Sequence, residues 1–168
     1  MVELVLQNYG FNKERYKKEK EKLQKYLNNK VTIEHVGSTT IPDMHGKNIL
    51  DVLIGVPTKQ IFNEVKEQLL NIGYQINKES EEEIYQFLAT TKGETTEKDT
   101  HIHLALENTT SYKEFLILRN YLLNNKDEAR AYSNYKKELI KKGITDRKEY
   151  KRIKSLYVTK LINKAKGR

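Results

Sequence analysis

Hydrophobic residues recur with two different periods along the chain, which predicts a mixture of helices and strands. The β-branched segment 31–36 has the composition of a strand. Segment 49–56 is apolar except for Asp51, the pattern of a strand that is covered on both faces. The residues between them, 37–48, hold two glycines and a proline and are expected to form a loop.

Helices are predicted on either side of this pair of strands. A charged helix over 13–28 would start after Asn12 as its N-cap. Thr58 can cap a second helix, in which apolar residues recur at helical spacing until Gly73 ends it.

Two more strands and three more helices complete the expected layout. The strands lie near 84–91 and 100–107, and the polar stretch 92–99 between them reads as a turn or mobile loop. The helices are expected at 111–124, 128–142 and 147–165, the last two capped by Asp127 and Asp146. We therefore expect one α+β domain over 1–168, with a small mixed sheet flanked by helices in 1–110 and a helical segment in 111–168.

Composition narrows the class of protein. A chain of 168 residues is long enough for one core that buries roughly 70% of the unfolded surface. The absence of cysteine excludes disulfides, thiolate metal sites and thiol catalysis. No apolar run approaches the ~20 residues that span a bilayer, and no leader pattern opens the sequence, so a soluble cytoplasmic protein is expected.

Positive charge is concentrated in the last third of the chain. Residues 1–110 carry 14 Lys and Arg against 17 Asp and Glu, whereas residues 111–168 carry 17 against 6. A basic helical segment suits nucleotide phosphates, nucleic acid or another anion. A lysine-rich coding bias would explain the total of +8 but not its uneven distribution.

Asp51 stands out because an ionised carboxylate in an apolar strand needs a positive partner. That partner is expected to be a metal ion, Lys47 or a basic side chain from later in the chain; a buried ion pair that only stabilises the fold is the alternative. Arg119, Lys136 and Lys154 each fall inside an apolar helical stripe, a position that favours an anion nearby. We expect these three to converge on Asp51 or on bound phosphates, with chance placement as the alternative.

Two other groups of residues could contact a ligand. His101 and His103 are two apart in a strand, so both rings project from one face and could bind a metal or phosphate. His35, which is just before Gly37, could do the same or be a hydrogen-bonded core histidine. The segment from Gly37 through Ser38 and Thr39 offers close backbone approach, amides and hydroxyls to a phosphate.

These segments together resemble the GrpB family, a group placed in the nucleotidyltransferase superfamily. The likeness extends over about residues 2–165 and is carried by four motifs: His35-Val36-Gly37-Ser38-Thr39-Thr40-Ile41-Pro42, Lys47-Asn48-Ile49-Leu50-Asp51-Val52-Leu53, His101-Ile102-His103-Leu104 and Leu118-Arg119-Asn120-Tyr121-Leu122. The resemblance implies a nucleotidyltransferase-like fold, in which a Gly-Ser turn touches the triphosphate and carboxylates on the next strand hold Mg²⁺.

This sequence departs from the superfamily pattern. Asp51 would be the first carboxylate, but Leu53 occupies the second position and His103 the third. One carboxylate with histidines is a poor match for two Mg²⁺ ions and suits a single divalent ion, Mg²⁺ or a softer one such as Mn²⁺ or Zn²⁺, or none. Asp51, His101 and His103 are the candidate metal ligands.

Three functions follow as hypotheses. The first is nucleotidyl transfer from a nucleoside triphosphate to a small-molecule or protein acceptor, with Asp51 and His103 catalytic. The second is a catalytically reduced protein of the same fold that binds nucleotides or other anions. The third is a nucleic-acid binder that uses the basic segment, with Tyr132, Tyr135, Tyr150 and Tyr157 stacking on bases or, as the alternative, packed in the core. The residues expected to bind phosphates are His35, Gly37, Ser38, Thr39, Lys47, Arg119, Lys136 and Lys154.

Overall fold

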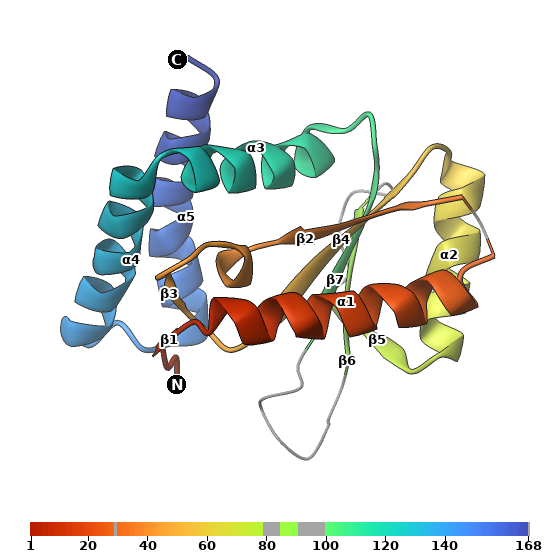
Figure 1. Cartoon of the computed structure of the whole chain (residues 1–168), viewed down its shortest axis with the longest axis horizontal. Helices are drawn as coiled ribbons and strands as arrows, with labels where there is room; N and C mark the ends of the chain where they lie inside the picture. The colour runs from red at the N-terminus through yellow and green to blue at the C-terminus, as the bar shows by residue number, and fades with distance from the viewer. Residues whose placement is uncertain (29, 79–84, 91–99, 168) are drawn as a thin grey trace.

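A mixed five-stranded sheet with helices on both faces forms the centre of the part of the chain that the structure describes (Figure 1). The computed structural model of the protein describes residues 1–28, 30–78, 85–90 and 100–167. β4 pairs in parallel with β7, and the other neighbours in the sheet are antiparallel. In their order across the sheet, the strands are β2 (Thr32–Val36), β4 (Leu50–Val56), β7 (Thr100–Leu106), β6 (Tyr85–Thr90) and β5 (Tyr74–Lys78).

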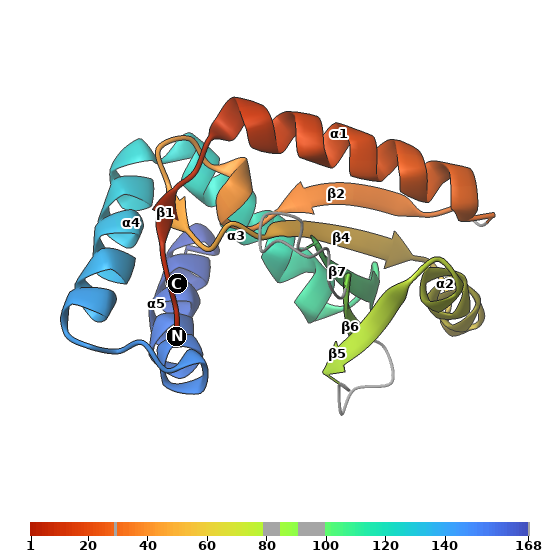
Figure 2. The ribbon, with the colours of Figure 1, turned by 90° about the horizontal axis from the view of Figure 1, so that it is seen from below.

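Alternation along β4 divides its side chains between two apolar clusters. Leu50, Val52, Ile54 and Val56 pack against α1 (Tyr9–Tyr26) and α2 (Lys59–Asn71). Both ribbon views place α1 alongside β2 (Figures 1 and 2). Leu53 faces the other way and packs against α3 (Thr110–Asn124). Because side chains alternate with a period of two, Asp51 lies on the α3 face as well.

The last three helices pack together at the end of the sheet where Asp51 lies (Figure 1). α4 (Lys126–Lys141) and α5 (Arg147–Ala165) join α3 there. They bury the loop after β2, which contains a short 3-10 helix, η1 (Ser38–Thr40), and the strand β3 (His45–Gly46). β3 pairs with β1 (Val5–Leu6), so the N-terminal segment is anchored against the same helices.

Most predicted elements are confirmed, with corrections at two helix starts. The helix expected from residue 13 starts at Tyr9, because the side chain of Asn8 accepts a hydrogen bond from the amide of Phe11. Asn12 lies buried inside that helix and donates to Gln7. The N-cap position of α4 is Asn125 rather than Asp127, which lies in the first turn. Thr58 and Asp146 are N-caps, as predicted.

Three short strands were absent from the predicted layout. β1 and β3 have two residues each, and β5 follows α2 directly after Gly73. The predicted turn at 92–99 lies outside the described residues. The division of the chain near residue 110 stays a prediction. In the described part of the chain, no helix has the length and apolar character needed to span a membrane.

Candidate functional site

Asp51 lies between two histidines from the neighbouring strand. Its Oδ1 is 3.1 Å from His103 Nε2 and 3.5 Å from His101 Nδ1. The three side chains are 23%, 13% and 22% exposed in that order, so the cluster is partly buried. His101 and His103 are therefore hydrogen-bond partners of Asp51, and Lys47 and the helical Lys154 also interact electrostatically with it, as the sequence predicted.

The parallel register of β4 and β7 brings these residues together. Asp51 pairs with His101 and Leu53 with His103, so the two histidines flank the carboxylate on the α3 face. The two strands are about 50 residues apart in the chain. Their register is fixed because the apolar side chains of both strands must face α1 and α2 to be buried.

The histidine pair sets the ionisation state of Asp51. Burial by itself raises the pKa of the carboxyl group, because it disfavours the charged form. Hydrogen bonds and positive charge from His101 and His103 outweigh burial and hold the pKa well below its usual range. Asp51 is therefore an ionised hydrogen-bond acceptor at neutral pH.

A fourth residue, Tyr85 on β6, extends this cluster. Its hydroxyl is 2.7 Å from His103 Nδ1, so both ring nitrogens of His103 are engaged. Phe115 of α3 lies against the same imidazole, with 4.5 Å between the ring centroids. Sequence reasoning missed Tyr85, since only the antiparallel pairing of β6 with β7 places it beside His103.

The Gly37–Ser38 turn packs directly on Asp51. Gly37 has a φ of +78°, which favours glycine, and a β-carbon built there would overlap the Asp51 carboxylate. Gly46 lies equally close to the Ser38 side chain. These contacts place the turn against Asp51, and the electrostatic interaction of Lys47 with Asp51 places that lysine in the same region, as the sequence predicted.

Lys47, Lys136 and Lys154, here called the lysine cluster, lie near one another: Lys154 interacts electrostatically with both of the others, and Asp51 interacts with Lys47 and Lys154. Lys47 Nζ and Lys154 Nζ lie 5.7 Å and 6.0 Å from the centroid of the same ring, that of Tyr150. Lys136 is 97% buried, donates to the carbonyl of His45, and has its Nζ 4.7 Å from the centroid of Tyr132.

Burial and neighbouring positive charges lower the pKa values of these lysines. Burial, followed by the charge of Lys154, lowers the pKa of Lys136 to about 7. The pKa values of Lys47 and Lys154 are also lowered, first by burial, although the negative charge of Asp51 opposes the shift in both. Within the described residues, no member of the lysine cluster forms an ion pair with an acidic side chain.

Arg119 does not have Asp51 as its partner. Its Nη1 is 2.6 Å from Glu34 Oε2 and donates to the carbonyl oxygen of His35 at 3.0 Å. The charge of Arg119 is therefore matched by Glu34, which lies on β2 and was not considered in the sequence analysis. Its expected role in binding phosphate stays a prediction.

His35 and Thr39 contact each other on the opposite side of β2. His35 Nε2 is 2.8 Å from Thr39 Oγ1, and the imidazole stacks on Tyr16 of α1 with 4.7 Å between centroids. Burial lowers the pKa of His35 to about 4, with Arg119 and Arg15 adding to the shift and Asp51 opposing it. This matches the alternative of a hydrogen-bonded core histidine, and ligand binding by these two residues stays a prediction.

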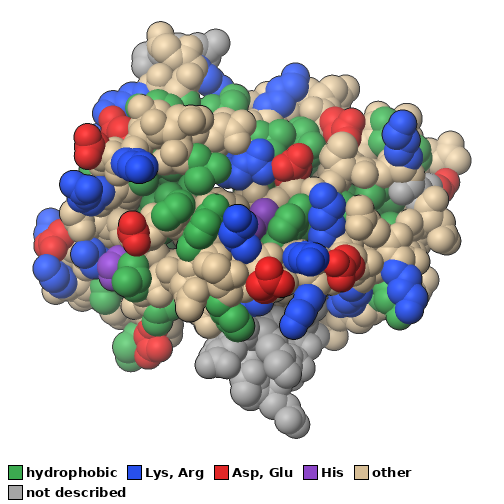
Figure 3. Space-filling model, in the orientation of Figure 1, with side chains coloured by type: hydrophobic (Ala, Val, Ile, Leu, Met, Phe, Trp, Pro, Cys, Tyr) green, Lys and Arg blue, Asp and Glu red, His purple; other side chains and the backbone are tan. Residues whose placement is uncertain are grey.

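The tyrosines of α4 and α5 pack against one another. Tyr132 and Tyr150 are buried, and Tyr157 stacks on Tyr132 and Tyr135 at 5.5 Å and 4.4 Å. These contacts agree with the core alternative rather than with base stacking. On the face in Figure 3, Lys and Arg are spread over both ends of the molecule and interspersed with acidic residues, instead of forming one continuous patch.

The donor set around Asp51 does not fit a pair of magnesium ions. Such ions need several oxygen ligands, whereas the second carboxylate position is a fully buried Leu53, and the donors that the described residues place beside Asp51 are imidazoles. Both imidazoles also approach the same carboxylate oxygen instead of a common vacant point. Among the residues that the structure describes, no three His, Cys, Asp or Glu side chains are arranged to hold a metal ion.

A protein-family model described as GrpB protein matches residues 2–164. Among curated proteins, the chain is 26% identical to the UPF0157 protein SCO7215 of Streptomyces coelicolor, over 92% of this chain and 80% of that protein. It is 30% identical to the UPF0157 protein PA4798 of Pseudomonas aeruginosa, over 79% of this chain but only 54% of that longer protein.

Solved structures agree on the fold. The conserved protein GrpB from Enterococcus faecalis superposes with a TM-score of 0.81 at 25% identity, covering 97% of this chain and 96% of that one. A cytoplasmic RNA terminal U-transferase matches with a TM-score of 0.52 at 16% identity, over 82% of this chain and 48% of the other. The α+β, nucleotidyltransferase-like fold expected from the sequence is confirmed.

Proposed function

This chain belongs to the GrpB family, and we propose that it binds the phosphate groups of a nucleotide at the lysine cluster. The observation that carries the proposal is the unbalanced charge of Lys47, Lys136 and Lys154 beside the Gly37–Ser38 turn. Burial lowers the pKa of all three lysines, and the charge of Lys154 lowers the pKa of Lys47 and Lys136 further, so an anion that enters between them stabilises their ammonium forms.

The surroundings of the cluster suit a phosphate-bearing ligand. The Ser38 hydroxyl lies against Gly46, the residue before Lys47, so this loop offers a hydrogen-bond donor near the lysine cluster. Asp51 adds one negative charge to this region, but its Oδ1 is already engaged by His101 and His103. The region therefore retains more positive than negative charge, which favours a polyanion over a single carboxylate.

The proposal is tested by calorimetric titration of the full chain with ATP and with inorganic tripolyphosphate. We expect Lys154→Gln to weaken binding of both at least tenfold. Lys160→Gln, an exposed position on the same helix, is the matched control and should leave both affinities unchanged. Equal losses in the two variants would show that the effect is long-range charge, and no binding of either anion to the unchanged chain would refute the proposal.

Nucleotidyl transfer is the second candidate, favoured by the placement of Asp51 behind a Gly-Ser turn in a nucleotidyltransferase-like fold. In that reaction an acceptor hydroxyl attacks the α-phosphorus of a nucleoside triphosphate and diphosphate leaves. Asp51 would be catalytic, and Mg²⁺ or Mn²⁺ would be supplied in the assay. The side chains around Asp51 do not fit a pair of Mg²⁺ ions, so phosphate binding is better supported than nucleotidyl transfer.

Asp51→Asn separates the two functions. For metal-independent binding, loss of a negative charge next to the lysine cluster should strengthen tripolyphosphate binding severalfold. For nucleotidyl transfer, the same change should abolish incorporation of label from α-labelled nucleotides in the presence of Mg²⁺ or Mn²⁺. Transfer that persists undiminished in Asp51→Asn would remove Asp51 from any catalytic role.

A further inference from the structure

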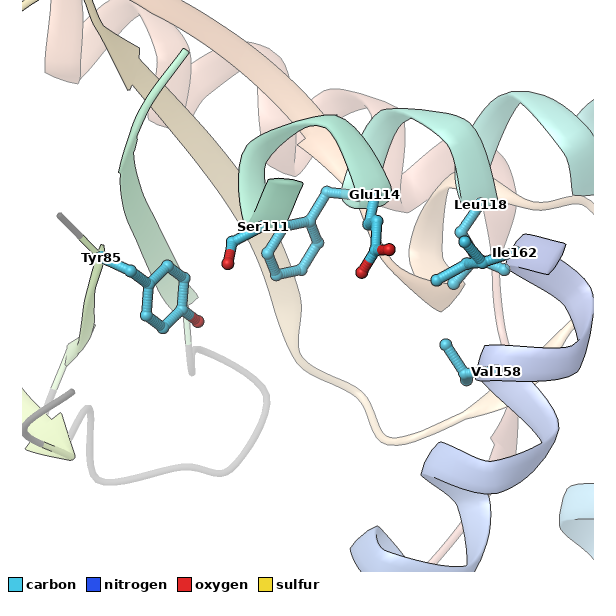
Figure 4. Close-up of a pocket in the computed structure, with 7 residues that line it drawn as sticks. Tyr85, Ser111, Glu114, Leu118, Val158 and Ile162 are labelled. Atoms are coloured by element: carbon cyan, nitrogen blue, oxygen red, sulfur yellow. The ribbon is translucent and has the colours of Figure 1, made fainter. Parts of the chain in front are cut away.

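A cavity of about 280 Å³ lies between the sheet and two of the C-terminal helices, next to the Asp51 cluster. Figure 4 shows Tyr85 pointing from β6 toward this space, with Val158 and Ile162 of α5 on its far side. Ser111, Glu114, Phe115 and Leu118 of α3 complete the lining. The walls are mainly apolar, with a few polar groups, which is the usual character of a small-molecule site.

The cavity and the Asp51 cluster share a wall. The Tyr85 hydroxyl contacts His103, whose other nitrogen is 3.1 Å from Asp51, so one imidazole separates the cavity from the carboxylate. Phe115 also touches both, since it lines the cavity and packs on the His103 ring. The cavity is therefore adjacent to the Asp51 cluster.

Helix α5 connects the cavity to the lysine cluster. Lys154 and Val158 are four residues apart, so they lie on the same face of the helix, with a rise of roughly 6 Å between them. A ligand that lies along this face would have charge matched to Lys154 at one end and an apolar group beside Val158 and Ile162 at the other.

We infer that the cavity binds the nucleobase of the nucleotide whose phosphates lie on the lysine cluster. This inference rests on the proposed function. The volume of about 280 Å³ lies just below the roughly 300–1,000 Å³ of small-molecule sites, so it suits one ring system rather than a whole nucleotide. A heterocycle also matches the wall better than an alkyl chain does, because its polar edge can pair with the Ser111 hydroxyl or the Glu114 carboxylate.

Glu114 gives the cavity a means of discriminating among bases. Its Oε1 accepts a hydrogen bond from Lys166 at 2.7 Å, which leaves capacity on the carboxylate for a second donor. An exocyclic amine of adenine, cytosine or guanine is such a donor, whereas uracil has only its N3–H, which lies between two carbonyl oxygens that a carboxylate repels. We expect nucleotides with an amino group on the base to bind more tightly than UTP.

The experiment compares the four nucleoside triphosphates with tripolyphosphate by calorimetry on the full chain at one pH and ionic strength. At least one amino-bearing nucleotide should bind tenfold or more tightly than tripolyphosphate. Val158→Trp, which fills the cavity, should remove this advantage and leave the tripolyphosphate Kd within twofold. Leu156→Trp, on the exposed face of the same helix, is the matched control and should change neither Kd.

Thermal unfolding establishes whether each variant folds. If Val158→Trp does not fold, Ser111→Phe on the opposite wall of the cavity provides a second variant that fills it. Equal Kd values for tripolyphosphate and all nucleotides, unaffected by either filling variant, would overturn the inference and leave phosphate binding intact. Geranyl diphosphate binding as tightly as ADP would also overturn it, because the cavity would then recognise apolar area alone. If neither tripolyphosphate nor any nucleotide binds, the proposed function and this inference fall together.

Discussion

The backbone of Gly37 lies directly against the carboxylate of Asp51, leaving no room for a β-carbon at position 37. This contact joins the turn after β2 to the acidic residue of β4, and it explains why a glycine is required there. Position 37 requires glycine for two reasons: its φ is +78°, and its backbone lies in close contact with a charged side chain.

Gly37→Ala should therefore destabilise the protein more than its backbone conformation alone requires. We expect a loss of about 1 kcal/mol from the positive φ and a further loss of about 1–3 kcal/mol from displacing Asp51. Gly143→Ala isolates the first effect, because Gly143 has a φ of +80° and open space around its β-position. Denaturant unfolding of both variants measures the two losses in free energy of unfolding. Equal losses would mean that Asp51 moves aside without destabilising the fold.

Anion binding should be coupled to proton uptake by Lys136. Its pKa is lowered to about 7, so the side chain is mostly neutral at pH 8, and a polyanion nearby raises the pKa again. Titration with tripolyphosphate at pH 8, in buffers of different ionisation enthalpy, should report uptake of a fraction of a proton up to about one. Lys136→Met should reduce the uptake, and an unchanged value in that variant would contradict the assignment.

Acid should destabilise the protein through His35. Its pKa is about 4 in the folded chain and about 6.5 when unfolded, so between these values the unfolded state binds more protons. The free energy of unfolding should therefore decrease as the pH falls from about 6.5 to 4, with His35 contributing about 2 kcal/mol. His35→Gln should remove that part of the slope, which urea unfolding at several pH values can measure; parallel slopes would show that His35 is not responsible.

The Arg119–Glu34 ion pair should stabilise the fold more than an exposed pair does. With an 18% exposed Arg119 and a 40% exposed Glu34, we expect a coupling energy of about 1 kcal/mol in a cycle of Arg119→Met and Glu34→Gln. The Lys141–Glu138 pair, 72% and 53% exposed, is the control and should give about 0.3 kcal/mol. Comparable coupling in both cycles would show that partial burial adds nothing.

Local sequence signals were sufficient for most elements but not for their ends. Thr58 and Asp146 cap helices as predicted, because a side-chain oxygen just ahead of an apolar helical stripe is a local signal. Asn12 was a wrong choice between two asparagines, since Asn8 four residues earlier has the same capping chemistry. β5 was missed because its alternating run, YQIN, is short, and the strand is stabilised by pairing with β6.

The candidate site was predicted as a set of residues but not as a set of contacts. Gly37, Lys47, Lys154 and Asp51 are neighbours, as the motifs suggested. The partner of Arg119, however, is Glu34, and a helical stripe cannot reveal which anion on another element it faces. Tyr85 gave no signal at all, because its importance comes from one contact with His103.

By itself, the sequence determined the alternation of helices and strands, the acidic residue in an apolar strand and the excess of lysine that follows residue 110. Those features depend on neighbours within a few residues, where periodicity and residue type are decisive. Only the tertiary structure decided that Asp51 is bound by His101 and His103, that Arg119 is matched by Glu34, and that a cavity lies beside Tyr85. These outcomes depend on strand register and helix packing between segments that are distant in the sequence. Register and packing are fixed by burial of hydrophobic side chains from the whole chain, which no local stretch of sequence reveals.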